Sequence, residues 1–192
     1  MQNNPNISPL MNNRWSPRAF DPEKLVPKEQ LENLLQAASW APSSGNGQPW
    51  HFIVGHNFDK CHEAVLSTLG PGNQIWAKNA PILMITVAKL SRNDRPNRHA
   101  FHDVGMATEN MVLQALDQNL YCHIMGGFSA DKAREVFNIP EDYEAVSAVS
   151  IGYMGDKNSL PDDLKEREGT NRERRPLADF VFTEKWGNPI SW

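Results

Sequence analysis

The chain has 192 residues, of which 40% are hydrophobic and 22% are charged, and its formal net charge is -4. This composition is typical of a water-soluble globular protein with one core, and the negative charge disfavours general nucleic-acid binding, which needs a basic face. No apolar run approaches the roughly 20 residues that cross a bilayer, and the Asn- and Pro-rich start lacks the features of a secretory signal. Cys61 and Cys122 form no paired motif, so we expect free thiols in a cytoplasmic protein without a membrane partner.

An arginine-rich turn and an amphipathic helix come first. Arg14-Trp15-Ser16-Pro17-Arg18 sets two guanidinium groups on either side of a hydroxyl group. This combination suits a phosphate, because the planar fork of arginine donates two parallel hydrogen bonds, but it also fits a plain solvated turn. From residue 31 to residue 38, leucine and alanine recur at the i, i+3, i+4, i+7 spacing, which predicts a core-facing helix over residues 27–40.

A loop rich in hydrogen-bonding groups follows, with the sequence APSSGNGQPW over residues 41–50. Its prolines and glycines suit neither a helix nor a strand, and the glycines let the backbone approach a ligand closely. Two serines, an asparagine, a glutamine and a tryptophan can hydrogen-bond there. The loop therefore either binds a ligand or is a polar surface loop without a binding role.

The rest of the chain alternates apolar runs with turn residues. We predict strands over residues 52–54, 81–88, 121–125 and 145–153, and helices over residues 60–69, 73–79, 101–120 and 130–137. The nearly all-apolar run 81–88 indicates a strand buried on both faces. The helix over 101–120 is the longest, and its apolar seam indicates a central position or one shared with a second subunit. Strands and helices intermix over 1–192 without a linker, which indicates a single domain with an α+β, three-layer fold.

Four polar or irregular segments separate or follow these elements. Residues 91–99 carry three arginines and are expected to be a mobile loop, with contact to an anionic substrate or dinucleotide as an alternative. Residues 155–170 are charged and are expected to be a loop. Residues 172–176 form a basic segment before a possible last strand over 177–182. The tail 186–192 carries two tryptophans, and we expect it to pack against another surface.

Several catalytic motifs are absent from the sequence. There is no nucleotide-binding P-loop, no complete dinucleotide fingerprint and no hydrolase nucleophile elbow. His99, His102 and Asp103 have helical spacing but lack a second pair of ligands, so we expect no metal site. No nucleophile–base pair stands out. If the protein is an enzyme, a bound cofactor therefore supplies the chemistry.

Taken together, the motifs resemble those of the FMN-dependent nitroreductase family. The resemblance extends from about Arg14 to Phe182, and the Pro-Ser-Ser-x-Asn-x-Gln-Pro-Trp block is its most specific part. It rests on stretches that occur in the family's order, namely 14–18, 41–50, 77–81, 103–105, 126–128 and 172–176. The family's fold is a three-layer α/β/α arrangement with a mostly antiparallel sheet flanked by helices. Its members are intertwined homodimers with two flavins at the interface.

The resemblance implies a set of FMN-binding residues and no catalytic side chain. In this sequence the set is Arg14, Trp15, Ser16, Arg18, Pro42, Ser43, Ser44, Asn46, Asn73, Gly126, Gly127, Arg172 and Arg174. Arginines from both chain ends and Ser16 would hold the phosphate, and Trp15 would add a backbone contact. Arg18, where many relatives have lysine, would lie near the N1/O2 edge of the flavin.

The remaining residues of this set would surround the ring system. Asn73 would bond its pyrimidine edge, and the N–H groups of Gly126 and Gly127 would face N5 and O4, although some relatives have glutamate where Gly126 stands. The residues from Pro42 to Asn46 would reach the flavin held mainly by the other subunit.

The implied activity is the reduction of nitroaromatic, quinone or other electron-poor acceptors by NAD(P)H. One site that serves both substrates in turn gives ping-pong kinetics. Two alternatives stay open: another flavin chemistry on the same fold, such as dehalogenation or dehydrogenation, and a flavin-binding regulator without turnover. The sequence does not select the acceptor or choose between NADH and NADPH.

Overall fold

A four-stranded antiparallel sheet forms the middle layer of the computed structural model, which describes residues 6–169 and 172–191. Its order is β1 (Trp50–His56), β2 (Ile82–Lys89), β6 (Tyr143–Gly152) and β5 (Tyr121–Met125). β2 is central and nearly all its side chains are buried. This confirms the expectation of a strand covered on both faces, because successive side chains of a strand point to opposite sides.

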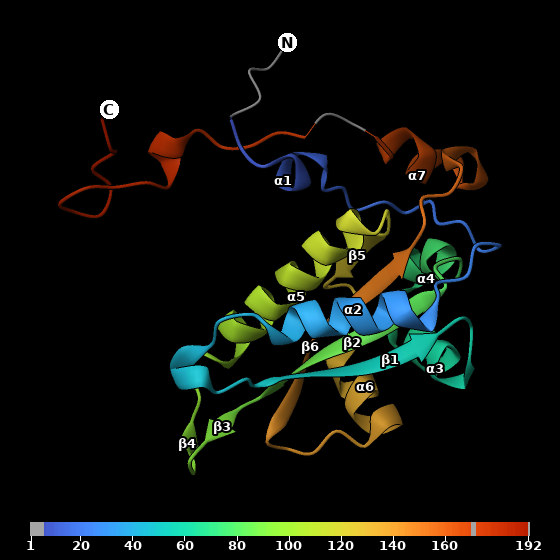
Figure 1. The fold of residues 1–192 in the computed structure, drawn as a ribbon, viewed down its shortest axis with the longest axis horizontal. Helices are drawn as coiled ribbons and strands as arrows, with labels where there is room; N and C mark the ends of the chain where they lie inside the picture. The colour runs from blue at the N-terminus through green and yellow to red at the C-terminus, as the bar shows by residue number, and fades with distance from the viewer. Residues whose placement is uncertain (1–5, 170–171, 192) are drawn as a thin grey trace.

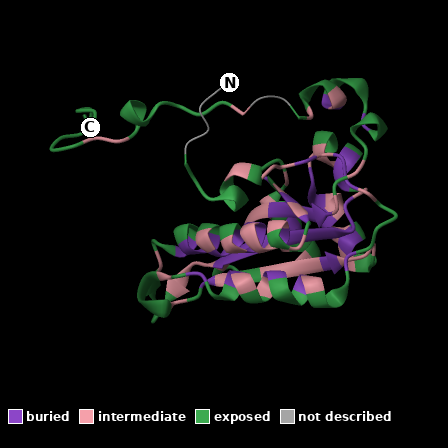
Figure 2. Ribbon diagram, turned by 45° about the horizontal axis from the view of Figure 1, so that its top comes forward, coloured by how far each residue is buried: buried purple, intermediate pink, exposed green. Residues whose placement is uncertain are grey.

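Helices α2 (Lys28–Ser39) and α5 (Ala100–Asp117) pack against each other and cover one face of the sheet (Figure 1). Ile82 and Met84 of β2 face this layer, where they join Leu34 of α2 and Met111 of α5 in one apolar cluster. The predicted seam of the long helix is therefore buried against the sheet and α2. Figure 2 shows the buried residues concentrated between the layers.

Three further helices lie against the opposite face: α3 (Lys60–Thr68), α4 (Pro71–Ala77) and α6 (Ala130–Phe137). Leu83, Ile85 and Val87 of β2 point into this second cluster, which also holds the buried Trp76 of α4. The two helical layers on either side of the sheet confirm the predicted α+β, three-layer fold. No helix within the described part of the chain is long and apolar enough to cross a membrane.

Two polar segments predicted to be loops contain regular structure. The arginine-rich break forms a small hairpin of β3 (Ser91–Arg92) and β4 (Arg95–Pro96). The charged stretch after β6 forms a 3-10 turn, η2 (Lys157–Ser159), and a short helix, α7 (Asp162–Arg167). Acidic residues in the first turn of α7 and basic residues in its last turn complement the helix dipole, which explains why so polar a stretch is helical.

The C-terminal segment extends away from the three layers (Figure 1). The predicted strand over 177–182 is wrong: the segment forms a 3-10 turn, η3 (Leu177–Asp179), and one isolated bridge joins Phe182 to Pro189. The tail also does not pack on the layers, because the side chain of Trp186 is 93% exposed and contacts the ring of Phe182. Trp192 lies outside the described residues. A strand needs a hydrogen-bonding neighbour, and within the described residues no strand of either sheet pairs with this segment.

The short helix α1 (Pro9–Asn13) lies over the end of α5 and leads into the arginine-rich turn. Trp15 to Arg18 then pass close to Glu168, at the end of α7. The two ends of the chain therefore meet beside the sheet.

The contact between β1 and α3 leaves no room for a side chain at Gly55. A Cβ atom there would lie 2.2 Å from the backbone nitrogen of His62. We therefore expect Gly55→Ala to lower the free energy of unfolding by about 2 kcal/mol or more, since overpacking forces the backbone to move.

The matched control is Gly72→Ala in α4, where an added Cβ meets nothing within 4 Å. This change should be neutral or stabilise by up to about 1 kcal/mol, because alanine favours helices. Urea denaturation of both variants measures the difference. Equal stability of the two variants would contradict this packing account.

Candidate functional site

A cavity of about 400 Å³ opens where the two ends of the chain meet. The residues that line it are Arg14, Trp15, Ser16, Arg18, His123, Arg167, Arg172 and Arg174. Five of these eight are arginines, which stay charged at all ordinary pH values. No carboxylate lines the cavity. It is therefore strongly electropositive, and its donors match the oxygen atoms of a phosphate.

Backbone carbonyl groups from the N-terminal segment hold one of these arginines in place. The Arg172 guanidinium donates hydrogen bonds to the carbonyl oxygens of Asn12 and Arg14. Arg14 in turn donates to the hydroxyl of Ser16 at 2.9 Å. Among the described residues, Arg174 donates only to the adjacent carbonyl of Glu173, at 2.7 Å, which uses one of its five N–H donors. The structure thus brings together the phosphate-binding residues expected from both chain ends.

Glu168 fixes the segment that carries Trp15 and Arg18. Its carboxylate accepts hydrogen bonds from the indole N–H of Trp15 at 3.2 Å and from the backbone N–H of Arg18 at 3.2 and 3.3 Å. It also forms a long ion pair with the Arg18 guanidinium at 3.8 Å, and its own side chain is 7% exposed. A buried carboxylate with these partners orients Arg18 next to the cavity.

His123 contributes a neutral ring to the same cavity. Burial lowers the pKa of His123 to about 4, and the neighbouring Arg18 and Arg14 add to this effect, while a hydrogen bond to Pro17 opposes it. Its Nδ1 lies 2.9 Å from the carbonyl oxygen of Pro17 and must be the donor there, which leaves Nε2 without a proton in the neutral ring. His123 therefore adds a hydrogen-bond acceptor among the arginines rather than another positive charge.

The two glycines that follow β5 lie beside the start of α4. The side-chain amide of Asn73 donates to the carbonyl oxygen of Gly127 at 3.0 Å, and Gly70 donates to the same oxygen at 2.9 Å. A Cβ atom at Gly127 would lie 2.7 Å from the Asn73 amide nitrogen, whereas Gly126 has open space. Asn73, Gly126 and Gly127 are thus brought together as expected, although one amide hydrogen of Asn73 is used within the chain.

The loop from Pro42 to Asn46 is not brought to this cavity. It contains η1 (Ser44–Asn46) and lies beside the first turn of α5, at the opposite end of the α2–α5 layer from the arginine cavity (Figure 1). Asp103 accepts a hydrogen bond from the backbone N–H of Ser44 at 3.1 Å, and its carboxyl group is buried. Arg92 donates to the carbonyl oxygens of Ser44 and Gly45, both at 2.6 Å. The loop is well fixed, but in one chain it forms a separate region.

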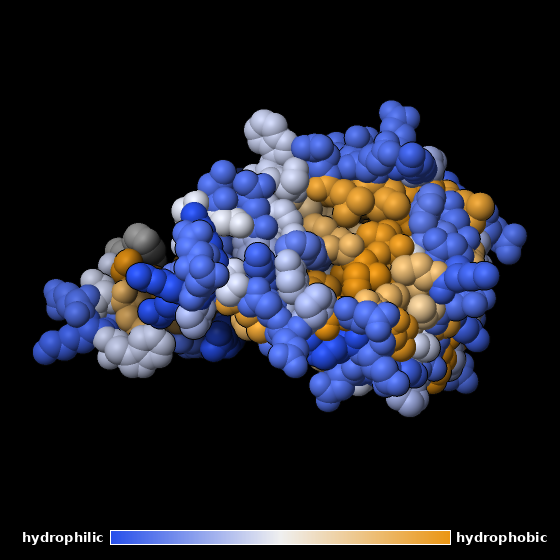
Figure 3. Space-filling model, turned by 90° about the horizontal axis from the view of Figure 1, so that it is seen from below, coloured by the Kyte–Doolittle hydropathy of each residue, from blue (hydrophilic) through white to orange (hydrophobic). Residues whose placement is uncertain are grey.

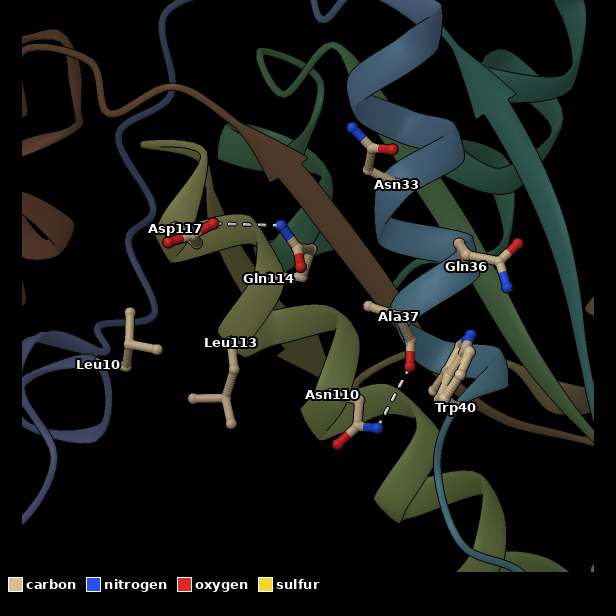
Figure 4. Close-up of a pocket in the computed structure, with 9 residues that line it drawn as sticks. All are labelled: Leu10, Asn33, Gln36, Ala37, Trp40, Asn110, Leu113, Gln114 and Asp117. Carbon is tan, nitrogen blue, oxygen red and sulfur yellow. Dashed lines mark hydrogen bonds between the residues drawn. The ribbon is translucent and has the colours of Figure 1, made fainter.

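A groove of about 590 Å³ between α2 and α5 differs from the arginine cavity in the residues that line it (Figure 4). Amide side chains and apolar groups line most of it, and Leu10 of α1 reaches toward it. Asn110 donates to the carbonyl oxygen of Ala37 across the two helices at 3.2 Å. Trp40 at its rim is 80% exposed. With Asp117 as its only ionisable residue, the groove offers surface for contact rather than groups for catalysis.

Sequence reasoning missed four residues of these sites. Arg167 and His123 line the arginine cavity, Glu168 orients Arg18, and Arg92 fixes the loop. The charges of these residues were visible in the sequence but their roles were not; the partners of Arg92, for example, lie 47 and 48 residues away in the chain. Within the described ranges, no group of three or more His, Cys, Asp or Glu residues is arranged to hold a metal ion.

Comparison with known proteins gives consistent results. The model of the family described as "Nitroreductase family" matches residues 11–153. A protein of Archaeoglobus fulgidus, provisionally named NADH dehydrogenase/NAD(P)H nitroreductase, is 30% identical over 171 residues, which cover 85% of this chain and 90% of that protein.

Two solved structures have a similar fold. A crystal structure described as an oxidoreductase containing FMN is 37% identical and has a TM-score of 0.91 over 98% of this chain and 96% of its own. A nitroreductase family protein from Clostridium difficile is 27% identical, with a TM-score of 0.71 over 92% and 96% of the two chains.

We expect Arg174→Ala to weaken FMN binding by about 30-fold, the effect of losing one charge-assisted pair worth about 2 kcal/mol. Riboflavin, which lacks the phosphate, should lose less than about twofold. Fluorescence titration of the flavin-free protein with both ligands measures the two affinities.

The matched control is Arg175→Ala, because Arg175 does not line the cavity and its guanidinium lies over the ring of Phe180 at 5.7 Å. This variant should bind both flavins as the unmodified protein does. Equal losses of FMN and riboflavin affinity in Arg174→Ala would show that Arg174 is not at the phosphate.

Proposed function

The chain belongs to the nitroreductase family, and on that premise we propose that it is an FMN-dependent oxidoreductase that uses NAD(P)H to reduce electron-poor acceptors. The observation that carries the proposal is the cavity lined by five arginines and a neutral histidine. A phosphate dianion is stabilised by several forked donors. The donor set therefore fits the phosphate of FMN, with Arg14, Ser16, Arg172 and Arg174 as its holders.

The groups proposed for the ring system lie on rigid elements close to the core. Arg18 is held by Glu168, so its positive charge has a defined position for stabilising a reduced, anionic flavin. Gly126 and Gly127 follow a strand of the central sheet, and Asn73 is hydrogen-bonded to Gly127. The N–H groups of both glycines are donors in none of the hydrogen bonds of the described loops and turns. They are therefore proposed as the donors to the flavin edge.

We further propose that the complete site needs two copies of the chain. The loop from Pro42 to Asn46 would then complete the flavin site whose phosphate is held by the partner. The support is the separation of this loop from the arginine cavity in one chain (Figure 1). Because the loop is fixed by Arg92 and Asp103, it does not need to refold to serve a second chain.

Exposed apolar surface supports this homodimer. Phe101 at the start of α5 is 46% exposed, and Trp40 stands at the rim of the groove between α2 and α5 (Figure 4). The C-terminal segment exposes Leu177, Phe180 and Trp186 away from its own core. β1 is an edge strand, and the view from below, onto that side of the sheet, shows a hollowed apolar area with hydrophilic borders (Figure 3). Apolar surfaces of this kind mark contact sites in otherwise polar proteins.

When bound, FMN would supply the reversible hydride and electron transfer that protein side chains lack. The chain's own residues would bind and orient the flavin, and water would supply protons, so we assign no catalytic side chain. Reductant and acceptor would use one site in turn, which gives ping-pong kinetics. Nitroaromatics and quinones are the proposed acceptor classes.

The test is the absorbance spectrum of the purified protein, followed by steady-state oxidation of NADH and NADPH with menadione or a nitroaromatic as acceptor. We expect a yellow protein that releases about one FMN per chain, and parallel double-reciprocal lines for reductant and acceptor. A yellow protein without turnover would favour a flavin-binding regulator. A colourless protein that does not bind added FMN would contradict the cofactor and the function together.

A further inference from the structure

We propose that the hairpin between β2 and α5 forms a second anion-binding site, which binds the carboxylate or phosphate group of a small-molecule substrate. The proposal rests on the proposed function, because it concerns the substrates of that enzyme. The site is a cavity of about 500 Å³. Its lining residues are Ser44, Arg92, Asn93, Arg95, Pro96, Asn97, Arg98 and His99.

The hairpin has a defined shape. Asn93 and Asp94 occupy its tip with φ values of 49° and 56°, the left-handed conformation that a two-residue turn requires and that Asn and Asp tolerate. At its base, the hydroxyl of Ser91 donates to the Asp142 carboxylate at 2.6 Å, and the backbone of Asn97 donates to that of Leu90 at 2.6 Å. The arginines therefore project from a fixed support.

The three arginines of the hairpin and of the turn that follows it divide into two kinds. Arg92 is structural, because both ends of its guanidinium donate to carbonyl oxygens of the loop at Ser44 and Gly45. Arg95 and Arg98 are exposed, and neither side chain forms a hydrogen bond or ion pair with any described residue. Their forked donors are available to a ligand.

The charge of the residues that line this cavity is one-sided, although Asp94 at the hairpin tip and Asp103 beside Ser44 are close neighbours. Arg92, Arg95 and Arg98 line it and no carboxylate does, in a chain whose formal net charge is -4. Like charges gathered on an otherwise acidic protein cost electrostatic energy, which a bound anion offsets. A carboxylate or phosphate matches the planar fork of arginine better than a neutral group does.

The position of the cavity identifies the ligand as a substrate and not as FMN. The phosphate of FMN has its own donors in the arginine cavity at the other end of the α2–α5 layer. The hairpin instead contacts the loop from Pro42 to Asn46 through Arg92, and that loop is the part proposed to complete the flavin site. A substrate that reaches the flavin past this loop passes Arg95 and Arg98. The anionic group belongs either to the 2′-phosphate of NADPH or to a negatively charged acceptor.

Direct binding to the purified protein, with whatever flavin it retains, tests the proposal in matched pairs of ligands. One pair is 2′,5′-ADP and 5′-AMP, which differ by the 2′-phosphate. The other is 4-nitrobenzoate and 4-nitrobenzamide, which differ by the negative charge. The variant Arg95→Ala/Arg98→Ala is compared with Arg95→Lys/Arg98→Lys, which keeps the charge, and with Lys28→Ala/Lys60→Ala, which removes two exposed charges of α2 and α3.

In Arg95→Ala/Arg98→Ala, the affinity for either 2′,5′-ADP or 4-nitrobenzoate should fall about tenfold. The affinity for its partner in the pair, 5′-AMP or 4-nitrobenzamide, should fall by less than about twofold. The lysine variant should keep at least part of the affinity, and the Lys28/Lys60 variant should behave as the unmodified protein. Loss confined to 2′,5′-ADP assigns the site to the reductant, and loss confined to 4-nitrobenzoate assigns it to the acceptor.

Unchanged affinities in both pairs, or equal losses for both members of each pair, would overturn the proposal. Calorimetric titration does not depend on turnover. A protein that fails the flavin and turnover test can therefore still show or lack this anion site, and the two failures are distinguishable.

Discussion

Five guanidinium groups that cannot lose their charge lie around one cavity, and their mutual repulsion is the constraint on which the rest of the structure depends. The chain limits this cost in three ways. Carbonyl groups of Asn12 and Arg14 accept from Arg172, the Glu168 carboxylate lies beside Arg18, and burial keeps His123 neutral. A bound phosphate would offset what remains. The N-terminal turn is held beside the segment after α7 by hydrogen bonds, from Arg172 to the carbonyl groups of Asn12 and Arg14 and from Trp15 and Arg18 to Glu168.

The three-layer core separates two regions that the proposed site needs together. The segments that line the arginine cavity, next to α1 and α7, lie at one end of the α2–α5 layer, and the Pro42–Asn46 loop lies at the other (Figure 1). At the cavity, the Glu168 carboxylate holds the N-terminal turn by a hydrogen bond from Arg18. At the other end, the loop is held by hydrogen bonds to the Asp103 carboxylate and from the Arg92 guanidinium. Since neither can move without breaking these bonds, a second chain is the simplest way to unite them. The exposed C-terminal aromatic residues fit the same arrangement.

The sequence predicted those parts of the fold that depend on local apolar pattern. The strand over 121–125 and the helix over 130–137 have the predicted bounds, and the buried strand is shifted by one residue. The hairpin at 91–96 was missed because two-residue strands are too short to show an alternating hydrophobic pattern. The helix α7 was missed because it is marked only by acidic residues in its first turn and basic residues in its last turn. The strand over 177–182 was wrong because an apolar run becomes a strand only beside a pairing neighbour. Four of the five cavity arginines were predicted from the family resemblance, namely Arg14, Arg18, Arg172 and Arg174, whereas Arg167 was not. Glu168 was also missed, because its partners Trp15 and Arg18 lie 150 or more residues away in the chain.

The measurement that tests the central claim most directly is subunit complementation of FMN binding. Arg174→Ala impairs the phosphate end of the site. Ser44→Ala/Asn46→Gly impairs the loop, with glycine chosen because Asn46 has a φ of 56°. A heterodimer of the two variants, isolated with two different tags, contains one site with both halves intact and one with neither. The account predicts about one tightly bound FMN per heterodimer, with the affinity of the unmodified protein, and weak binding by each homodimer. A heterodimer that binds no better than the homodimers would contradict a site shared between two chains.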